Sequence, residues 1–314
     1  MRASGTQRRL LDSILSYWSW KKSNVAGTTP TSQNPHTHTD THKEENPKKE
    51  GLGFNFKWGS KSSSSSLSSV SSSSSSSSSL AAVREVVERR RSCRRFDPAA
   101  PIDPALLADL LTATTRAPTA FNLQPWVAVV VQEAAQREAL AKATLDQIQP
   151  REAPVTIIFA GDTQPVRNAA AALEMGLESG HLAPTYGAVF LRHVYYQMHA
   201  GPLDAFAHIK GAVASNYSAW TGTPMLSVPT NMQAYAWKQT MIPATTFVYL
   251  ATAAGLDTSI IEGFDEAQVR NVVQLPSHYT IPVIVSVGYG TREGFRSVKS
   301  PRFPPSHLIR WGKY

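Results

Sequence analysis

The C-terminal three quarters of the chain contain three apolar runs that are short and rich in β-branched residues. Trp126–Val131 and Val155–Ala160 are two of them, and the second is bounded by Pro154 and Gly161. Ile281–Gly288 is the third. Runs of this length between turn residues are typical of buried strands, so we predict three strands.

Helical periodicity fills the segments between and around these strands. Asp103 and Pro104 form a cap and first-turn pair at the start of one such segment, and Gly255 stands where a left-handed residue ends another. Pro243 is expected to kink or interrupt the segment that Gly255 ends. Helices are expected around Val83–Val87, after Asp103, over Gln132–Asp146, over Asn168–His199 with breaks at Gly180 and Pro184, before Trp220, and over Gln233–Ala254. Helices and strands in this order predict an α+β fold rather than a regular strand–helix alternation.

Residues 1–80 have a different composition. Residues 62–79 are serine except for Leu67 and Val70, and such a segment buries too little to offset the entropy of ordering its backbone. We therefore predict a disordered Ser-rich arm over 1–80 and a folded domain over 81–314. Arg2, Arg8 and Arg9 precede an apolar stretch, which is typical of an organelle transit peptide. This predicts a mitochondrial or chloroplast location, and a cytoplasmic one if the arm is an ordinary tail.

Charge and composition exclude several classes of protein. Residues 1–80 carry 10 of the 31 basic and 5 of the 23 acidic residues, so +5 of the net charge of +8 belongs to the arm. The remainder is only mildly basic, which argues against a nucleic-acid partner. No apolar run reaches the roughly 18 residues of a membrane span. The chain has one cysteine, and His193 and His199 are six residues apart, so we predict no disulfide and no metal site.

Three segments carry candidate chemistry. Five arginines lie within seven residues from Arg89 to Arg95, and guanidinium groups match phosphate oxygens. The loop Ala117–Trp126 places amide side chains before a strand, where they can bond the edge of a planar heterocycle. The segment Gly255–Asp265 contains a Glu262-Gly263 pair that can present backbone N–H groups to a ligand. Taken singly, these segments are equally consistent with a solvated basic face, a loop and a turn.

Together, in this order and spacing, the segments resemble the nitroreductase family over residues 84 to 314. The family pattern opens with Arg-x-Ser-x-Arg/Lys-x-Phe, here Arg90–Phe96. A loop of the form Pro-Ser-x-x-Asn-x-Gln-Pro-Trp follows, here Pro118–Trp126, and a Gly-Leu-Asp…Glu-Gly-Phe-Asp segment and a basic tail close the chain. The resemblance implies a mixed central sheet flanked by helices, and a homodimer whose C-terminal extension wraps the partner subunit.

The resemblance also implies an FMN site. The implied cofactor-binding residues are Arg90, Arg91, Ser92, Arg94, Pro118, Thr119, Ala120, Asn122, Asp146 or Gln147, Gln239, Ile261, Glu262, Gly263 and Arg302. Those from Pro118 to Asn122 would come from the partner subunit, and Glu262 and Gly263 would lie at flavin N5. Arg94 is the expected partner of negative charge near flavin N1. Two departures stand out: Ala120 replaces a serine, and Ser300 stands where the family has a lysine, which here is displaced to Lys299.

The implied activity is reduction of quinones, nitroaromatics or related small-molecule acceptors by ping-pong hydride transfer, with NAD(P)H as co-substrate. The cofactor carries this chemistry, so no catalytic side chain is expected beyond the Glu262–Gly263 region. Three alternatives remain open. They are another flavin chemistry on the same fold, such as flavin fragmentation or reductive dehalogenation, a flavin-binding protein without turnover, and a basic Ser-rich interaction protein that carries this domain.

Overall fold

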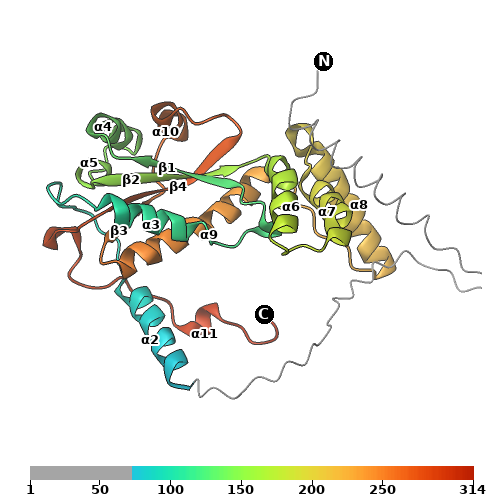
Figure 1. Ribbon diagram of the computed structural model, residues 1–314, viewed down its shortest axis with the longest axis horizontal. Helices are drawn as coiled ribbons and strands as arrows, with labels where there is room; N and C mark the ends of the chain where they lie inside the picture. The colour runs from blue at the N-terminus through green and yellow to red at the C-terminus, as the bar shows by residue number, and fades with distance from the viewer. Residues whose placement is uncertain (1–72) are drawn as a thin grey trace, which may run out of the picture. The chain divides into compact units, whose positions relative to one another are not determined.

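The computed structural model of the chain describes residues 73–314 (Figure 1). The predicted transit peptide and most of the predicted arm lie outside the described residues. Within them the chain divides into two compact units, one of residues 169–230 and the other of residues 73–168 and 231–314. No helix in the described part is both long and apolar enough to span a membrane.

A four-stranded sheet in the order β1-β2-β4-β3 forms the centre of the larger unit. Its strands are β1 (Trp126–Val131), β2 (Val155–Asp162), β3 (Asp257–Ile261) and β4 (Tyr279–Gly288). The strands pair antiparallel, with Val131 opposite Thr156 and Val155 opposite Val287, and an isolated parallel bridge joins Ser92 to Thr258. The three predicted strands and the α+β class are confirmed, whereas β3 was missed.

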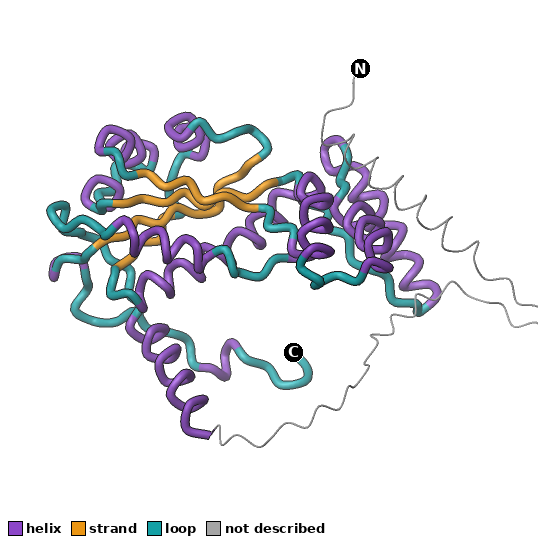
Figure 2. The backbone as a smooth tube through the Cα atoms, in the orientation of Figure 1, coloured by secondary structure: helices purple, strands orange, loops and turns teal. Residues whose placement is uncertain are grey.

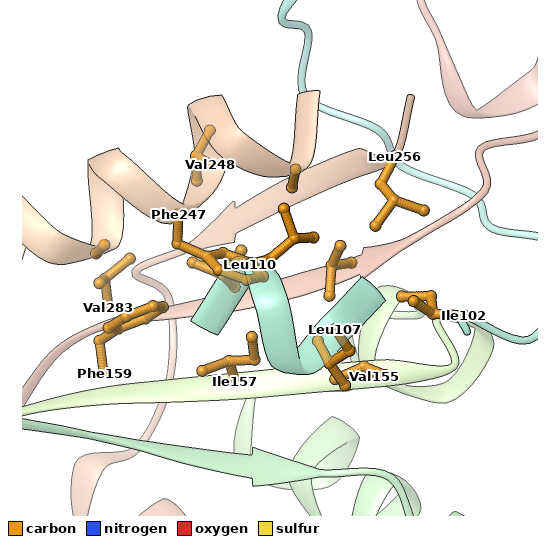
Figure 3. Close-up of a cluster of buried hydrophobic side chains, with 14 residues drawn as sticks. Ile102, Leu107, Leu110, Val155, Ile157, Phe159, Phe247, Val248, Leu256 and Val283 are labelled. Atoms are coloured by element: carbon orange, nitrogen blue, oxygen red, sulfur yellow. The ribbon is translucent and has the colours of Figure 1, made fainter. Parts of the chain in front are cut away.

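Helices cover both faces of this sheet (Figure 2). On one face, Val155, Ile157 and Phe159 of β2 pack in a cluster with α3 (Pro104–Thr114) and α9 (Met232–Ala253) (Figure 3). On the other face, Ile158 and Ala160 pack with α4 (Ala134–Ala143) and α10 (Glu266–Val273). A strand buried on both sides reads as a continuous apolar run, which is why β2 was recognisable from sequence.

Helix α9 carries one predicted site residue, Gln239, and it ends just before the predicted Gly255. The Asn231 side chain accepts a hydrogen bond from the N–H of Ala234 at the first turn. At the other end, Gly255 has φ +83° and the N–H of Leu256 donates to the carbonyl of Ala251 over 2.9 Å, which is a Schellman ending. The helix runs through Pro243 without interruption.

The predicted helix over Gln132–Asp146 is shorter than expected, because α4 ends at Ala143. Leu145 and Asp146 adopt left-handed backbone conformations, with φ of +59° and +58°, and the short helix α5 (Gln149–Glu152) follows. The chain therefore makes a turn at 144–148, between α4 and α5.

The smaller unit contains α6 (Ala169–Glu178), α7 (Gly187–Met198) and α8 (Ala205–Thr221). Gly180, at φ +69°, and the 3-10 turn Pro184–Tyr186 separate the first two helices, which confirms the predicted breaks.

Two segments of the larger unit expose apolar side chains. Helix α2 (Ser73–Arg89) begins within the arm as the sequence delimited it, and Leu80, Val83 and Val87 on it are exposed. The tail after the 3-10 turn Arg292–Gly294 contains only the short helix α11 (Pro305–Leu308). Its large exposed apolar side chains are Val298, Phe303, Leu308, Ile309, Trp311 and Tyr314.

Candidate functional site

In the segment Arg90–Phe96, side chains that contact other parts of the chain alternate with side chains that are exposed or half-exposed. Arg91, Cys93 and Arg95 are engaged with the rest of the chain. The Arg91 guanidinium donates to the carbonyl of Arg296 and lies over the Phe295 ring, the Cys93 side chain is buried, and Arg95 pairs with Glu152 over 2.7 Å.

The alternate residues have free donors. Arg90, Ser92 and Arg94 are exposed or half-exposed, and within the described residues their side chains make no hydrogen bond or ion pair. Two guanidinium groups and a hydroxyl at alternate positions are thus available to an anionic ligand. Of the four residues predicted here, Arg91 is the one that the structure commits elsewhere.

Backbone hydrogen bonds fix this segment on β3 and on the turn after β4. The Cys93 N–H donates to the carbonyl of Thr258 over 2.9 Å, and the Arg94 N–H donates to the carbonyl of Gly294 over 2.8 Å. The Asp257 carboxylate accepts from the N–H of Gly290 over 2.9 Å and holds that turn against the strand. Burial raises the pKa of the Asp257 carboxyl.

Cys93 is a buried thiol between arginines. Its side chain is 0% exposed, and burial raises the pKa of the thiol to about 11. The sulfur packs against Gly290 and Gly294, so it belongs to the packing that holds this segment.

The basic tail approaches the same segment through Lys299. Its Nζ donates to the carbonyl of Glu88 over 3.3 Å, two residues before Arg90. Arg302, which was predicted to reach the phosphate, instead bonds Ser300 and the carbonyl of Pro301 in its own segment. Thus the displaced lysine, and not the arginine, contacts the backbone just before Arg90.

The loop between α3 and β1 is strained and is tied to α9. Phe121, Asn122 and Gln124 have φ between +47° and +53°, conformations that cost non-glycine residues of order 1–3 kcal/mol each and persist only where the surroundings enforce them. The Ala120 N–H donates to the Oε1 of Gln239 over 2.8 Å. Two predicted site residues thus meet in one hydrogen bond.

Within this loop the remaining predicted residues differ in availability. The Thr119 hydroxyl accepts from the Gln124 N–H over 2.9 Å and so holds the loop. Pro118 and Asn122 are exposed, and the Asn122 side chain has no hydrogen-bond partner in the described part of the chain. Among the described residues, no hydrogen bond links Ala120 or Asn122 to Glu262 or Gly263.

The Glu262–Gly263 turn follows β3 directly and is held by the turn after α4. The Gln147 Nε2 donates to the carbonyl of Gly263 over 2.8 Å. Asp146 instead faces Arg151, with 2.7 Å between the charged groups, so of the two predicted alternatives Gln147 lies at the turn. The Ile261 side chain is buried in the core, which leaves only its backbone for a ligand.

Neither backbone conformation nor crowding by residues 73–314 requires a glycine at position 263. The φ of Gly263 lies outside the left-handed region, and a Cβ there would meet only the Gln147 Nε2, at 3.5 Å. Glycines of this kind are typical of places where a ligand approaches the backbone closely.

These features fit an extended, anionic, ring-bearing cofactor such as FMN. Strand β3 joins the two ends of the site, because Thr258 lies beside Ser92 and Glu262 follows the strand. Four residues of strand span roughly 13 Å at about 3.3 Å each. Free guanidinium and hydroxyl donors stand at one end, and an open glycine turn stands at the other.

Comparisons with known proteins agree with this arrangement. The nitroreductase family model matches residues 87–289. A Thermus thermophilus protein named NADH dehydrogenase is 30% identical over 223 residues, which are 71% of this chain and 92% of that protein. A nitroreductase-like protein from Streptococcus mutans superposes with a TM-score of 0.58 at 18% identity, over 76% of this chain and 100% of that one.

A protein from Exiguobacterium sibiricum, solved in complex with FMN, superposes with a TM-score of 0.55 at 22% identity, over 73% and 96% of the two chains. The structural likenesses show the fold, and the family match covers more than half of the chain and contains nearly all of the site. The chain belongs to the nitroreductase family.

Proposed function

We propose that this chain binds FMN and uses NAD(P)H to reduce quinones, nitroaromatics or related acceptors by ping-pong hydride transfer. The observation that carries the proposal is the alternation in Arg90–Phe96. Within the described residues it leaves the side chains of Arg90, Ser92 and Arg94 unpaired, beside the start of β3, which leads to Gly263. The named activity of the Thermus thermophilus relative and the FMN in the Exiguobacterium sibiricum structure support it.

At the phosphate end, Arg90, Ser92 and Arg94 would hold the FMN phosphate and ribityl chain. The Lys299 ammonium beside the Glu88 carbonyl is the fourth candidate donor. Cationic and hydroxyl donors of this kind form the strong, charge-assisted bonds that anchor phosphates in proteins.

At the ring end, FMN would supply the hydride-accepting chemistry, and the protein would orient it. The Gly263 N–H is the candidate donor to flavin N5, and the missing Cβ leaves the backbone open to a planar ring. Gln239 on α9 accepts a hydrogen bond from the Ala120 N–H, so these two residues would contact the ring together. The task of these groups is to fix the ring and to keep one face open, where NAD(P)H and the acceptor bind in turn.

The proposal includes a homodimer. Within the described residues, neither Ala120 nor Asn122 has a hydrogen bond to Glu262 or Gly263 of its own chain, yet the strained backbone of their loop calls for a fixed role. A partner subunit that brings this loop to the ring would provide that role. The exposed apolar residues of α2 and of the tail are surfaces that such a partner can cover.

The experiment that tests the proposal is an absorption spectrum of the purified full chain, followed by anaerobic titration with NADH and NADPH. We expect a yellow protein that takes up FMN and loses its flavin absorbance within seconds of reductant addition. Reoxidation by a quinone completes the cycle. A colourless protein that takes up no FMN would refute the proposal, and bound FMN that stays oxidised would assign the chain to flavin binding without turnover.

A further inference from the structure

The turn between α4 and α5 adopts a backbone conformation that its sequence does not favour. Leu145 and Asp146 are consecutive non-glycine residues with φ of +59° and +58°. Left-handed backbone is unfavourable for such residues, above all for a γ-branched leucine. Burial does not compensate, because the Leu145 side chain is 73% exposed. Some other interaction must hold the turn.

The guanidinium of Arg151 supplies that interaction. Its Nε and Nη2 donate to the two carboxylate oxygens of Glu138 on α4, over 2.7 and 3.1 Å. The same Nη2 donates to the Asp146 carboxylate over 2.7 Å, and Nη1 lies 3.4 Å from the Asp146 carbonyl oxygen. One planar group thus ties the strained residue to the preceding helix. The hydrogen bond from Arg151 lowers the pKa of the Glu138 carboxyl, so the pair stays charged.

The residue that this turn directs is Gln147. Its Nε2 donates to the Gly263 carbonyl over 2.8 Å, and no other atom lies near the position where a Gly263 side chain would begin. The Asp265 N–H donates to the carbonyl of Ala143 over 2.8 Å. The two hydrogen bonds flank the turn, so its geometry is set from the α4 side.

We propose that Arg151 is a positioning residue for the candidate ring site: it holds the strained turn at Leu145–Asp146, so that Gln147 fixes the peptide group of Gly263. The relevance to catalysis rests on the proposed function, whereas the positioning itself does not require a cofactor. An ordinary surface ion pair would be replaceable without consequence. Arg151 differs because it bonds two carboxylates and spans a helix and a strained turn.

The first test uses backbone hydrogen exchange of the full chain without cofactor. Arg151→Met is compared with Lys142→Met, which removes a cation 4.0 Å from the same Glu138 but does not reach Asp146. The Gln147 N–H donates to the Thr144 carbonyl and the Asp265 N–H to the Ala143 carbonyl. We expect exchange of these two amides to become about tenfold faster in Arg151→Met and to stay unchanged in Lys142→Met. Equal exchange in wild type and Arg151→Met would refute the positioning role.

Arg151→Lys is the control for global unfolding. It keeps the charge and the aliphatic stem, but an ammonium group cannot bond both carboxylates as the planar guanidinium does. It is expected to show the same local acceleration, with unchanged exchange in the strands β2 and β4. Wild-type exchange of the Gln147 and Asp265 amides in this variant would also count against the proposed geometry.

The second test uses the FMN-loaded enzyme. We expect Arg151→Met to lower the rate of flavin reduction by NAD(P)H about tenfold, since small displacements of a reacting group are costly. The Kd for FMN should change much less, because the phosphate end is untouched. Combination with Gln147→Leu should be non-additive, as expected of residues that act through one contact.

The two tests separate failure of the proposed function from failure of the positioning role. A wild-type chain that binds no FMN would refute the proposed function while the exchange result stands. Additive rate effects in the Arg151 and Gln147 variants, with FMN bound, would refute the link from Arg151 to the ring site.

Discussion

At the scale of single residues, the arginine-rich segment acquires its meaning from which side chains are already occupied. By charge alone, Arg90 and Arg91 are equivalent candidates for a phosphate site. The structure separates them, because Arg91 bonds the carbonyl of Arg296 whereas Arg90 has no side-chain partner in the described residues. A phosphate site requires donors that are held in place and yet unpaired, and only the alternate residues meet both conditions.

Arg94→Ala is therefore expected to weaken FMN binding without unfolding the chain. The Arg94 side chain has no hydrogen bond or ion pair to residues 73–314, so the free energy of unfolding without cofactor should stay unchanged. Loss of one charge-assisted hydrogen bond, worth roughly 1.5 kcal/mol, should raise the Kd for FMN about tenfold. Fluorescence titration of FMN measures this. Arg84→Ala on exposed α2 is the charge-matched control, and equal Kd values for the two variants would contradict the role.

Asp257 permits a prediction on pH. Burial raises the folded-state pKa of its carboxyl above the unfolded value near 3.9. Folding then binds a proton between the two pKa values, so the contribution to stability is present at low pH and is lost as the pH rises through the folded pKa. Asp257→Asn keeps an oxygen that can accept from Gly290 and removes the charge.

The variant should accordingly have a higher free energy of unfolding than wild type at pH 7, and this difference should shrink as the pH is lowered towards 4. Urea unfolding at both pH values measures it, and the difference between the two proteins cancels the titration of all other groups. A difference that is equal at the two pH values would show that ionisation of Asp257 does not contribute.

Sequence patterns selected candidate residues but did not reveal which groups these residues contact. Gln239 and the loop at Ala120 were both selected from the sequence, but their shared hydrogen bond was not predicted. In the tail, Lys299 bonds the Glu88 carbonyl and Arg302 bonds Ser300, and this backbone is irregular, so no periodicity predicts these contacts. Cys93 shows the same limit: its pKa depends on burial, which neighbours in sequence do not reveal.

At the scale of elements, the strand that joins the two ends of the site is the one that sequence did not reveal. Strand β3 begins Asp-Thr-Ser, and Thr258 and Ser259 are almost fully buried despite their hydroxyls. Patterns of apolar residues find strands such as β2, which are buried on both faces. A five-residue strand with polar residues inside is recognisable only from its pairing with β4.

The packing of β2 on α9 gives a prediction at this scale. A Cβ at Gly161 would lie 2.5 Å from the Thr240 Oγ1 and 2.8 Å from the Ala236 carbonyl oxygen. The second contact is with helix backbone, which cannot move alone, so Gly161→Ala should lower the free energy of unfolding by about 1–3 kcal/mol.

Gly187→Ala provides the matched control, because its Cβ would meet Leu173 only at 3.6 Å and Gly187 begins a helix. There the substitution should be neutral or slightly stabilising, given the helix propensity of alanine. Denaturant midpoints of the two variants decide the matter. A Gly161→Ala variant as stable as Gly187→Ala would mean that α9 is free to shift away from the sheet.

At the scale of the whole molecule, the distribution of exposed apolar residues points beyond the single chain. Trp311 is 92% exposed and Phe303 is 67% exposed, on a tail that forms only one short helix. Val83 and Val87 are exposed on α2 of the same unit. A chain gains nothing from such side chains unless another surface covers them, which is the physical argument for the proposed homodimer.

Removal of residues 303–314 tests whether the tail stabilises a homodimer. In a monomer the truncation should leave Tm unchanged, because the tail's apolar side chains are exposed. In a homodimer it should lower Tm and weaken the dependence of Tm on protein concentration, since association stabilises the folded state by mass action.

A second variant replaces Phe303, Leu308, Ile309 and Trp311 by serine and keeps Arg302, Arg310 and Lys313. If apolar burial drives association, this variant should behave as the truncation does, and a Tm equal to that of wild type at every concentration would contradict the role of the tail.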